Sequence, residues 1–296
     1  MGKTKEAKPF NRLAVEFQWT PELDEDHIFP KERELITQLR QDYPHISEWT
    51  DRLVLYFIFA RRHDLEQIKK LMDDNLKMLQ EYNLNRRMTA DELDPSYKTV
   101  PYITYFKNVT DCHDRPIIYA DLGLMDPKKN RKHILFPLLW YEQQFLTDNY
   151  TIRYLRNGIN CVVDMKNMAL RNFDMSSEGK ATHNAMMGVF PRRARAISVV
   201  NGGTFFRIIW SIAKGVAPKK MTKRIVNVPN KEELHKLIPT NRLLASLGGN
   251  PNLTFDYFVK EVEIYDRNYN TKEAISAKTR PALRAESEEP VSTSSS

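Results

Sequence analysis

The sequence predicts an α/β fold in which a helical N-terminal subdomain precedes a domain built on a mostly parallel sheet. Apolar residues recur at helical spacing from Pro30 to Asn85. Farther along the chain, short β-rich runs alternate with helical segments, which is the pattern of strands joined by crossover helices. The longest apolar run, Leu53 to Ala60, has eight residues, whereas a membrane span needs about 18. A hydrophobic content of 41% is that of a globular protein.

The N-terminal part divides into an irregular extension over residues 1–30 and a helical region over residues 31–95. The helical region should contain three or four amphipathic helices. Thr50 and Asp51 form a predicted N-cap in front of the apolar run.

The α/β domain is expected over residues 96–255, with strands and helices in alternation. The run 158–164 carries few charges, which is typical of a buried parallel strand. Strands are predicted at 101–106, 116–121, 158–164, 195–200 and 224–228. Helices are predicted at 132–152, 174–187, 203–214 and 231–238. The C-terminal segment, 256–296, turns polar, and we expect disorder from about residue 270.

The first residues and the cysteines indicate a cytoplasmic protein. The chain begins with a charged stretch, Met1 to Lys8, that lacks the apolar region of a secretory signal. A myristoylation motif that begins at Gly2 needs Ser or Thr at position 6, where this chain has Glu6. Cys112 and Cys161 are expected to be reduced thiols.

Residues 179–231 contain no acidic side chain, although average usage predicts about seven in such a window. The window holds eleven basic residues, and because the whole chain has a net charge of +7, the rest of the chain carries −4. The positive charge is therefore local and indicates an anionic partner surface. The basic residues are Lys180, Arg192, Arg193, Arg195, Arg207, Lys214, Lys219, Lys220, Lys223, Arg224 and Lys231.

The most apolar part of this window is the predicted helix at 203–214. One interpretation is an ordinary buried helix. The other is a gating helix that covers an apolar cavity and enters a membrane when it opens, with basic residues on both sides as docking groups. Gly202, Gly203 and Gly215 supply backbone freedom at its ends. The proposed gate residues are Phe205, Phe206, Ile208, Ile209, Trp210 and Ile212.

Motifs for catalysis and metal binding are missing from the sequence. There is no glycine-rich phosphate loop, no Gly-x-Ser-x-Gly and no His-Glu-x-x-His. Asp164 ends a predicted strand, where a catalytic carboxylate could lie, but a turn or N-cap aspartate is the preferred interpretation. We therefore expect no catalytic residues, no metal and no enzyme activity.

Five segments together resemble the CRAL-TRIO lipid-binding family between Asp51 and Gly249. Residues 53–65 resemble the family's L-L-R-F-L-R-A-R-x-F-D helix, and 114–119 and 157–164 match its G-R-P-V-I-Y and G-x-x-x-I-x-D strands. Residues 190–201 match Y-P-E-R…Y-I-I-N-A-P, and 247–249 match L-P-x-x-x-G-G. The resemblance implies a CRAL-TRIO domain with an apolar cavity for one hydrophobic ligand, closed by the helix that follows the N-A-P turn.

The resemblance also implies which residues line the cavity. They are Leu138, Tyr141, Phe145, Ile159, Val163, Met168, Met186, Phe190 and Ile197. Two positions depart from the family pattern. The N-A-P turn is Asn201-Gly-Gly203, and the P-E-R glutamate, associated with phosphatidylinositol in fungal members, is Arg192. The second departure argues against the fungal type of phosphatidylinositol exchange.

The basic residues are similar to those of the α-tocopherol transfer protein and cellular retinaldehyde-binding protein branch. In that branch a groove beside the gate binds the headgroup of a phosphatidylinositol bisphosphate. The corresponding residues here are Arg61, Arg193, Arg195, Lys220 and Arg224. Arginine suits bidentate phosphate contacts, and lysine adds a point charge.

The leading hypothesis is a soluble, monomeric lipid-binding and transfer protein without cofactor, which docks reversibly on phosphoinositide membranes and carries a lipid, tocopherol-like or retinoid-like ligand. The alternative is a phosphoinositide-sensing regulatory or scaffold module that transfers nothing. A nucleic-acid binder would need aromatic residues exposed for base stacking, and those of the basic window are assigned to the gate. A lipid hydrolase or isomerase would need a nucleophile–base pair. The sequence does not identify the cargo.

Overall fold

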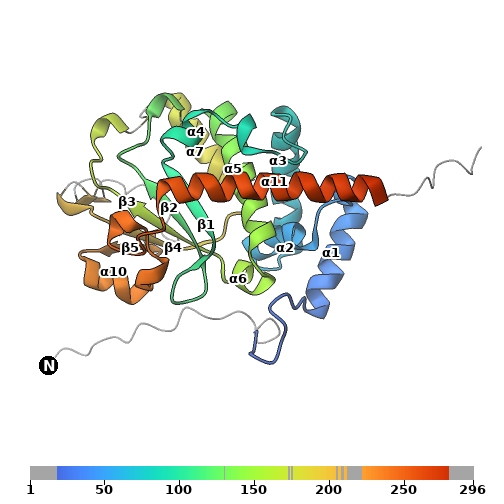
Figure 1. The fold of residues 1–296 in the computed structure, drawn as a ribbon. Coiled ribbons are helices and arrows are strands. Elements are labelled where there is room, and N and C mark those ends of the chain that lie inside the picture. Colours follow the sequence, from blue (N-terminus) through green and yellow to red (C-terminus); the bar gives the residue numbers. More distant parts are fainter. Residues whose placement is uncertain are drawn as a thin grey trace, which may run out of the picture.

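The computed structural model describes residues 19–279, apart from residues 130, 173, 175, 205, 208–209 and 212–221. Figure 1 shows an α/β layer at one end of the molecule and a group of helices at the other. The segment 19–29 has no regular secondary structure. The helical region comprises α1 (Pro30–Asp42), α2 (Asp51–Ala60), α3 (Leu65–Glu81) and the short α4 (Ser96–Thr99).

The helices of this region begin where the sequence supplies caps. The Thr50 hydroxyl accepts the Leu53 N–H at the start of α2, as predicted, and the Asp64 carboxylate accepts the Gln67 N–H at the start of α3. All side chains from Leu53 to Phe59 are buried, so α2 is a central helix of the core.

The sheet has five strands in the order β1-β2-β3-β4-β5. The strands are β1 (Ile103–Thr110), β2 (Pro116–Asp121), β3 (Ile159–Asp164), β4 (Ala194–Val200) and β5 (Ile225–Val228). The hairpin partner β1 is antiparallel to β2, and the remaining neighbours are parallel. The predicted mostly parallel α/β fold is therefore confirmed.

The strands are connected by α5 (Lys132–Asn149), α6 (Ile152–Asn157) and α7 (Ser177–Val189), and β5 leads into α10 (Lys231–Leu237). Successive parallel strands are added in one direction, so right-handed crossovers place the connecting helices on the same face. The register places Cys161 of β3 between Ile118 of β2 and Ile197 of β4, and Val163 between Ala120 and Val199. These side chains share one face because strand residues alternate.

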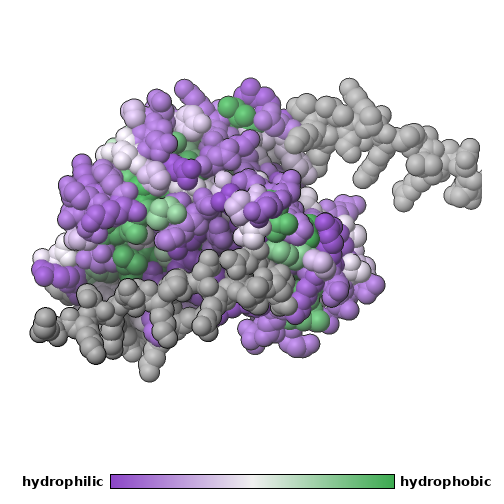
Figure 2. Space-filling view, turned by 90° about the horizontal axis from the view of Figure 1, so that it is seen from below, coloured by the Kyte–Doolittle hydropathy of each residue, from purple (hydrophilic) through white to green (hydrophobic). Residues whose placement is uncertain are grey.

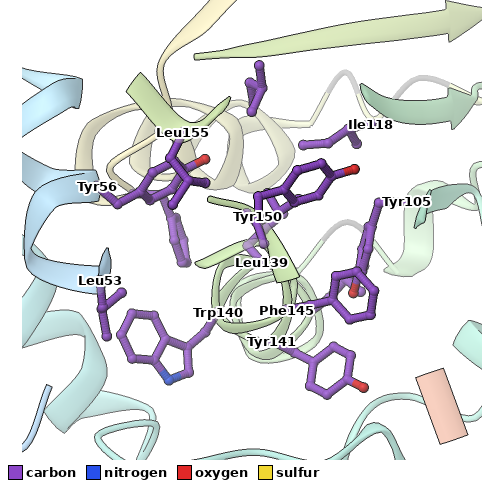
Figure 3. Close-up of a cluster of buried hydrophobic side chains, with 14 of the residues drawn as sticks. Leu53, Tyr56, Tyr105, Ile118, Leu139, Trp140, Tyr141, Phe145, Tyr150 and Leu155 are labelled. Atoms are coloured by element: carbon purple, nitrogen blue, oxygen red, sulfur yellow. The ribbon is translucent and has the colours of Figure 1, made fainter. Parts of the chain in front are cut away.

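The main core is a single apolar cluster that runs from the N-terminal helices through the sheet and α5. Figure 3 shows aromatic and aliphatic side chains gathered around α5, among them Trp140, Phe145 and Tyr150, with Tyr56 entering from α2. The helical region and the α/β layer thus share one core. A second, smaller cluster consists of Met165, Met168, Val199 and Phe206.

The prediction of disorder from about residue 270 is wrong for residues 270–279, because α11 (Phe255–Thr279) continues through them. The helix packs along the edge strand β1 and reaches the N-terminal helices (Figure 1). Phe258 and Val262 are buried, and the Tyr265 ring lies 4.9 Å from that of Phe145. This thin apolar stripe within a polar segment is why the sequence did not predict the helix. Residues 280–296 lie outside the described part of the chain.

Candidate functional site

Four arginines from three separate segments form a basic cluster, which we define as Arg62, Arg193, Arg195 and Arg224. Repulsion from Arg62 contributes to a lowered pKa of each of the other three. Arg62 follows α2 in a left-handed conformation, with φ of 55°. Arg193 directly precedes β4 and Arg195 is its second residue. Arg224 directly precedes β5, and its carbonyl oxygen accepts the Ile197 N–H.

Gly158 holds the backbone next to this cluster. Its φ is +77°, and a Cβ atom there would lie 2.5 Å from the Arg193 carbonyl oxygen and 2.7 Å from Arg195 Cγ. Only glycine allows α6 to turn into β3 this close to β4.

The electrostatics of the cluster are those of cations without counter-ions. Burial, followed by repulsion from Arg195, Arg62 and other arginines, lowers the pKa of Arg193 to about 9. Burial and repulsion from Arg62 and Arg224 lower the pKa of Arg195 to about 10. No member of the cluster makes an ion pair with a carboxylate in the described part of the chain. An anion would therefore be stabilised here.

The structure brings together three of the five predicted headgroup residues: Arg193, Arg195 and Arg224. Arg61 is not among the charges that perturb them; burial lowers its pKa, and its charged neighbour is Asp74. Lys220 lies outside the described residues. Sequence reasoning missed Arg62, whose direction depends on the left-handed turn after α2.

The basic cluster adjoins a buried ion-pair network at the N-terminal helices. Glu32 of α1 is fully buried and accepts hydrogen bonds from Arg156, at 2.8 Å, and from His63, at 3.1 Å. Burial alone would raise the pKa of Glu32, but these hydrogen bonds outweigh it, and the pKa is lowered. Arg193 donates to the Arg156 carbonyl oxygen, which ties the network to β4.

The helix after β4 packs over the sheet through Phe206, which contacts Val199 of β4 in the second apolar cluster. Gly203 has φ of +51°, and a Cβ atom on Gly202 would lie 2.6 Å from Phe206 Cβ. Phe206 is buried in the second apolar cluster and stacks on Trp210 at 5.9 Å, while Arg207 and Ser211 are exposed. The described part of this helix is therefore amphipathic, with its aromatic side turned to the sheet. The other proposed gate residues, Phe205, Ile208, Ile209 and Ile212, lie outside the described residues.

The sheet face beneath this helix is incompletely covered. Cys161, Val163 and Ile197 are only half-buried although β3 and β4 are inner strands. Ile225 on the neighbouring strand is also half-buried. Inner strands of a packed α/β layer are ordinarily buried on both faces, so this face borders open space.

The nine predicted cavity residues separate into two groups. Val163, Met168 and Ile197 belong to or contact the second apolar cluster, beneath the aromatic side of the helix. The others belong to or contact the main core: Leu138, Tyr141, Phe145, Ile159, Met186 and Phe190. Two of the core residues are directed toward the C-terminal helix, since Tyr141 donates to Asp266 and Phe145 contacts Tyr265.

A buried ion pair lies among these apolar residues. Arg192 donates to the carboxylate of Glu142 on α5 at 2.5 Å, and Glu142 is almost fully buried. Tyr56 of α2 and Cys161 of β3 interact electrostatically with this pair. Burial raises the pKa of the Cys161 thiol to about 11 and raises that of Tyr56, so both remain neutral.

Catalytic and metal-binding arrangements are not evident among the described residues. No group of three or more possible metal ligands occurs there. The Asp164 carboxylate accepts from the Lys166 N–H and the Asn201 side chain, both at 2.8 Å, as a turn-forming aspartate does. No helix of the described chain is long and apolar enough to cross a bilayer.

Seen from below, the surface is largely hydrophilic, with apolar patches both at the end that carries β5 and α10 and at the end that carries the N-terminal helices (Figure 2).

Comparison with known proteins gives consistent matches. A family model described as the CRAL/TRIO domain matches residues 101–249. A CRAL-TRIO domain-containing protein of Dictyostelium discoideum is 25% identical over 224 residues, which are 74% of this chain and 86% of that protein. The phosphatidylinositol/phosphatidylcholine transfer protein SFH12 of Arabidopsis thaliana is 21% identical over 73% of this chain, and the match spans 41% of its length. The solved structure of Sfh5 aligns with a TM-score of 0.52 at 14% identity, covering 83% of this chain and all of that one.

Proposed function

The chain belongs to the CRAL/TRIO domain family, and from this membership we propose that it binds one hydrophobic molecule in a gated cavity and transfers it between membranes. The observation that carries the proposal is the half-buried apolar face of β3 and β4 beneath an amphipathic helix. A relative named as a phosphatidylinositol/phosphatidylcholine transfer protein supports a lipid as the cargo. Apolar cavities with few polar groups are the usual form of such ligand sites.

Docking is assigned to the basic cluster. Three cluster arginines have a lowered pKa and no carboxylate partner in the described part of the chain, so an anionic headgroup would relieve their mutual repulsion. The cluster and the helix are consecutive along the chain, because β4 begins at the cluster and ends at the glycine turn. The proposed occupant of the cluster is the headgroup of a membrane phosphoinositide, which makes membrane association reversible.

A vesicle assay tests both parts. The protein should move a fluorescent lipid between phosphatidylcholine vesicles, and 5% phosphatidylinositol bisphosphate in the acceptor should accelerate transfer about tenfold or more. Charge reversal by Arg195→Glu should abolish this acceleration, while Lys180→Glu, at an exposed lysine of the same window on α7, should retain most of it. Equal transfer by both variants would refute docking at the cluster.

The vesicle assay also separates the alternative function. A phosphoinositide sensor would bind the same vesicles and transfer nothing. Mass spectrometry of lipid extracted from the purified protein adds an independent readout, because a carrier retains a stoichiometric cargo. Absence of both transfer and bound lipid would overturn the carrier proposal and leave the sensor.

A further inference from the structure

A pocket lies on the sheet face opposite the one beneath the proposed gating helix. Val162 and Val163 are neighbours in β3, so their side chains point to opposite faces, and Val163 contacts the second apolar cluster. Val162 pairs with Tyr119 of β2, which in turn pairs with Thr104 of β1. These three paired residues line a pocket of about 370 Å³, a volume typical of small-molecule sites. We call it the rear pocket.

The walls of the rear pocket come from segments that are far apart in the sequence. Val100 and Tyr102 precede β1, and Phe255 is the first residue of α11. The Tyr119 hydroxyl donates to the Arg242 carbonyl oxygen at 2.6 Å, which holds the segment before α11 against this face of the sheet. The shape of the pocket is therefore set by the strands and by a tertiary hydrogen bond.

The lining of the rear pocket is mainly apolar and aromatic. Val100 and Leu124 line it and keep 49% and 45% of their surface exposed. A ligand that covers them would remove apolar surface from water, which is favourable. Aromatic ring faces attract cations as well as apolar groups. The aromatic residues of the lining are Tyr102, Phe106, Tyr119 and Phe255.

Two carboxylates give the rear pocket its charge. Asp121 and Asp164 are the last residues of β2 and β3, pair directly in the sheet register, and both line the pocket. Neither makes an ion pair among the described residues, and the described lining includes no Lys, Arg or His. Burial raises the pKa of the Asp121 carboxyl, and repulsion from Asp164 adds to the rise. Exposed Lys166 and backbone hydrogen bonds offset it only in part.

We propose that the rear pocket binds an organic cation, an ammonium group carried on a small apolar body. The apolar body would cover the exposed surfaces of Val100 and Leu124, and the ammonium would lie between Asp121 and Asp164. Charge-assisted hydrogen bonds to carboxylates are stronger than neutral ones, so a neutral analogue would bind less tightly. An anionic analogue would be repelled.

The rear pocket is separate from both sites of the proposed carrier function. It lies at the carboxyl ends of the parallel strands β2 and β3, whereas Arg193 and Arg195 lie at the start of β4. Its charge is opposite to that of the basic cluster, and the sheet divides it from the proposed cargo cavity. The carboxyl ends of parallel strands are where open α/β sheets commonly bind ligands.

Calorimetric titration of the full chain at pH 7 tests the proposal with three compounds of matched shape: 2-phenylethylamine, 2-phenylethanol and 3-phenylpropanoate. The amine should bind about tenfold more tightly than the alcohol, the factor expected when a neutral hydrogen bond is replaced by a charged one. The carboxylate should bind most weakly of the three. Equal affinity for the amine and the alcohol would overturn the proposal.

Two variants locate the bound amine. Asp121→Asn should weaken the amine about tenfold and leave the alcohol within about twofold, because only the charge is removed. The control Asp126→Asn makes the same change at an exposed aspartate outside the lining, whose carboxylate accepts the Lys128 N–H, and should change neither. Val100→Trp, at an exposed position of the pocket, should obstruct the pocket and weaken both compounds.

The variants also separate the rear pocket from the cargo cavity. An amine affinity that stays unchanged in Asp121→Asn or in Val100→Trp would place the amine elsewhere and overturn the proposal. If Asp121→Asn does not fold, Val100→Trp and the comparison of amine with alcohol still decide. Lipid transfer between vesicles should be the same in Val100→Trp as in wild type, because the pocket lies on the other face of the sheet. A loss of transfer in this folded variant would contradict that separation.

Discussion

Replacing Arg195 by methionine should stabilise the protein while it destroys anion binding. Methionine keeps the apolar stem of the side chain and removes the cation. Burial, with repulsion from Arg62 and Arg224, lowers the pKa of Arg195 from 12.5 to about 10. At pH 7 the Arg195 guanidinium is protonated in both states, but the folded state binds that proton less tightly than the unfolded state does. The charge of Arg195 therefore lowers the free energy of unfolding.

The size of the effect follows from the shift. At 1.36 kcal/mol per pKa unit the upper limit is about 3.4 kcal/mol. Arg195 is only half-buried, and solvent screening reduces the value to about 1–2 kcal/mol. The midpoint of thermal unfolding should rise by about 2–6 °C.

Thermal unfolding at pH 7, with and without inositol trisphosphate, measures both effects. The ligand should raise the wild-type midpoint, by an amount equivalent to about 2.7 kcal/mol at 100 times its Kd, and should have little effect on Arg195→Met. The control is Arg207→Met, at an exposed arginine whose described hydrogen bond goes to Thr204. If Arg195→Met unfolds at a lower temperature than wild type, the repulsion argument is refuted.

Three further perturbations probe the scaffold. Gly158→Ala should destabilise by about 2–3 kcal/mol in denaturant unfolding, because the left-handed backbone and the close Arg193 carbonyl oxygen exclude a Cβ atom; an unchanged midpoint would contradict this. Burial raises the pKa of Glu261 to about 7, so the free energy of unfolding should fall as pH rises from about 4.5 through 7 and Glu261 ionises in the folded state. Glu261→Gln should reduce this fall by about 1 kcal/mol when unfolding is measured at pH 5.5 and 8. The same fall in the variant and in wild type would argue against the prediction. Glu32→Leu leaves Arg156 buried without its carboxylate and should cost about 3–5 kcal/mol in urea unfolding; a loss below 1 kcal/mol would show that Arg156 finds another partner.

The fold could be predicted from the sequence because its signals are local. Thr50 caps α2 and the run that follows is uniformly buried, as the pattern predicted. Strand β3 was recognised because it carries few charges. The helix α11 was not, because its buried residues Phe258 and Val262 are spread among polar ones. Its length depends on packing against β1 and the N-terminal helices, a tertiary contact that a local pattern does not contain.

The sequence predicted the positive charge of the candidate site, but not all of the residues that form it. The missing carboxylates of the basic window pointed to Arg193, Arg195 and Arg224, and repulsion from Arg195 and Arg224 does lower the pKa of Arg193. Arg62 and not Arg61 belongs to the cluster, because the turn after α2 adopts positive φ. This backbone conformation determines which of the two adjacent side chains faces β4. Pairing of Arg192 with Glu142 on a distant helix is likewise a property of the folded chain.

Strand β4 connects the proposed headgroup site to the proposed gating helix. Arg193 and Arg195 lie at its start, the glycine turn follows its last residue, and Arg224 directly precedes β5. The proposed gating helix therefore lies in the sequence between Arg195 and Arg224 of the cluster. A headgroup can favour the open state only as far as it binds that state more tightly. A headgroup held only by the cluster binds both states alike, so opening needs a contribution from the helix itself, and membrane insertion of Phe206 or Trp210 would supply that free energy.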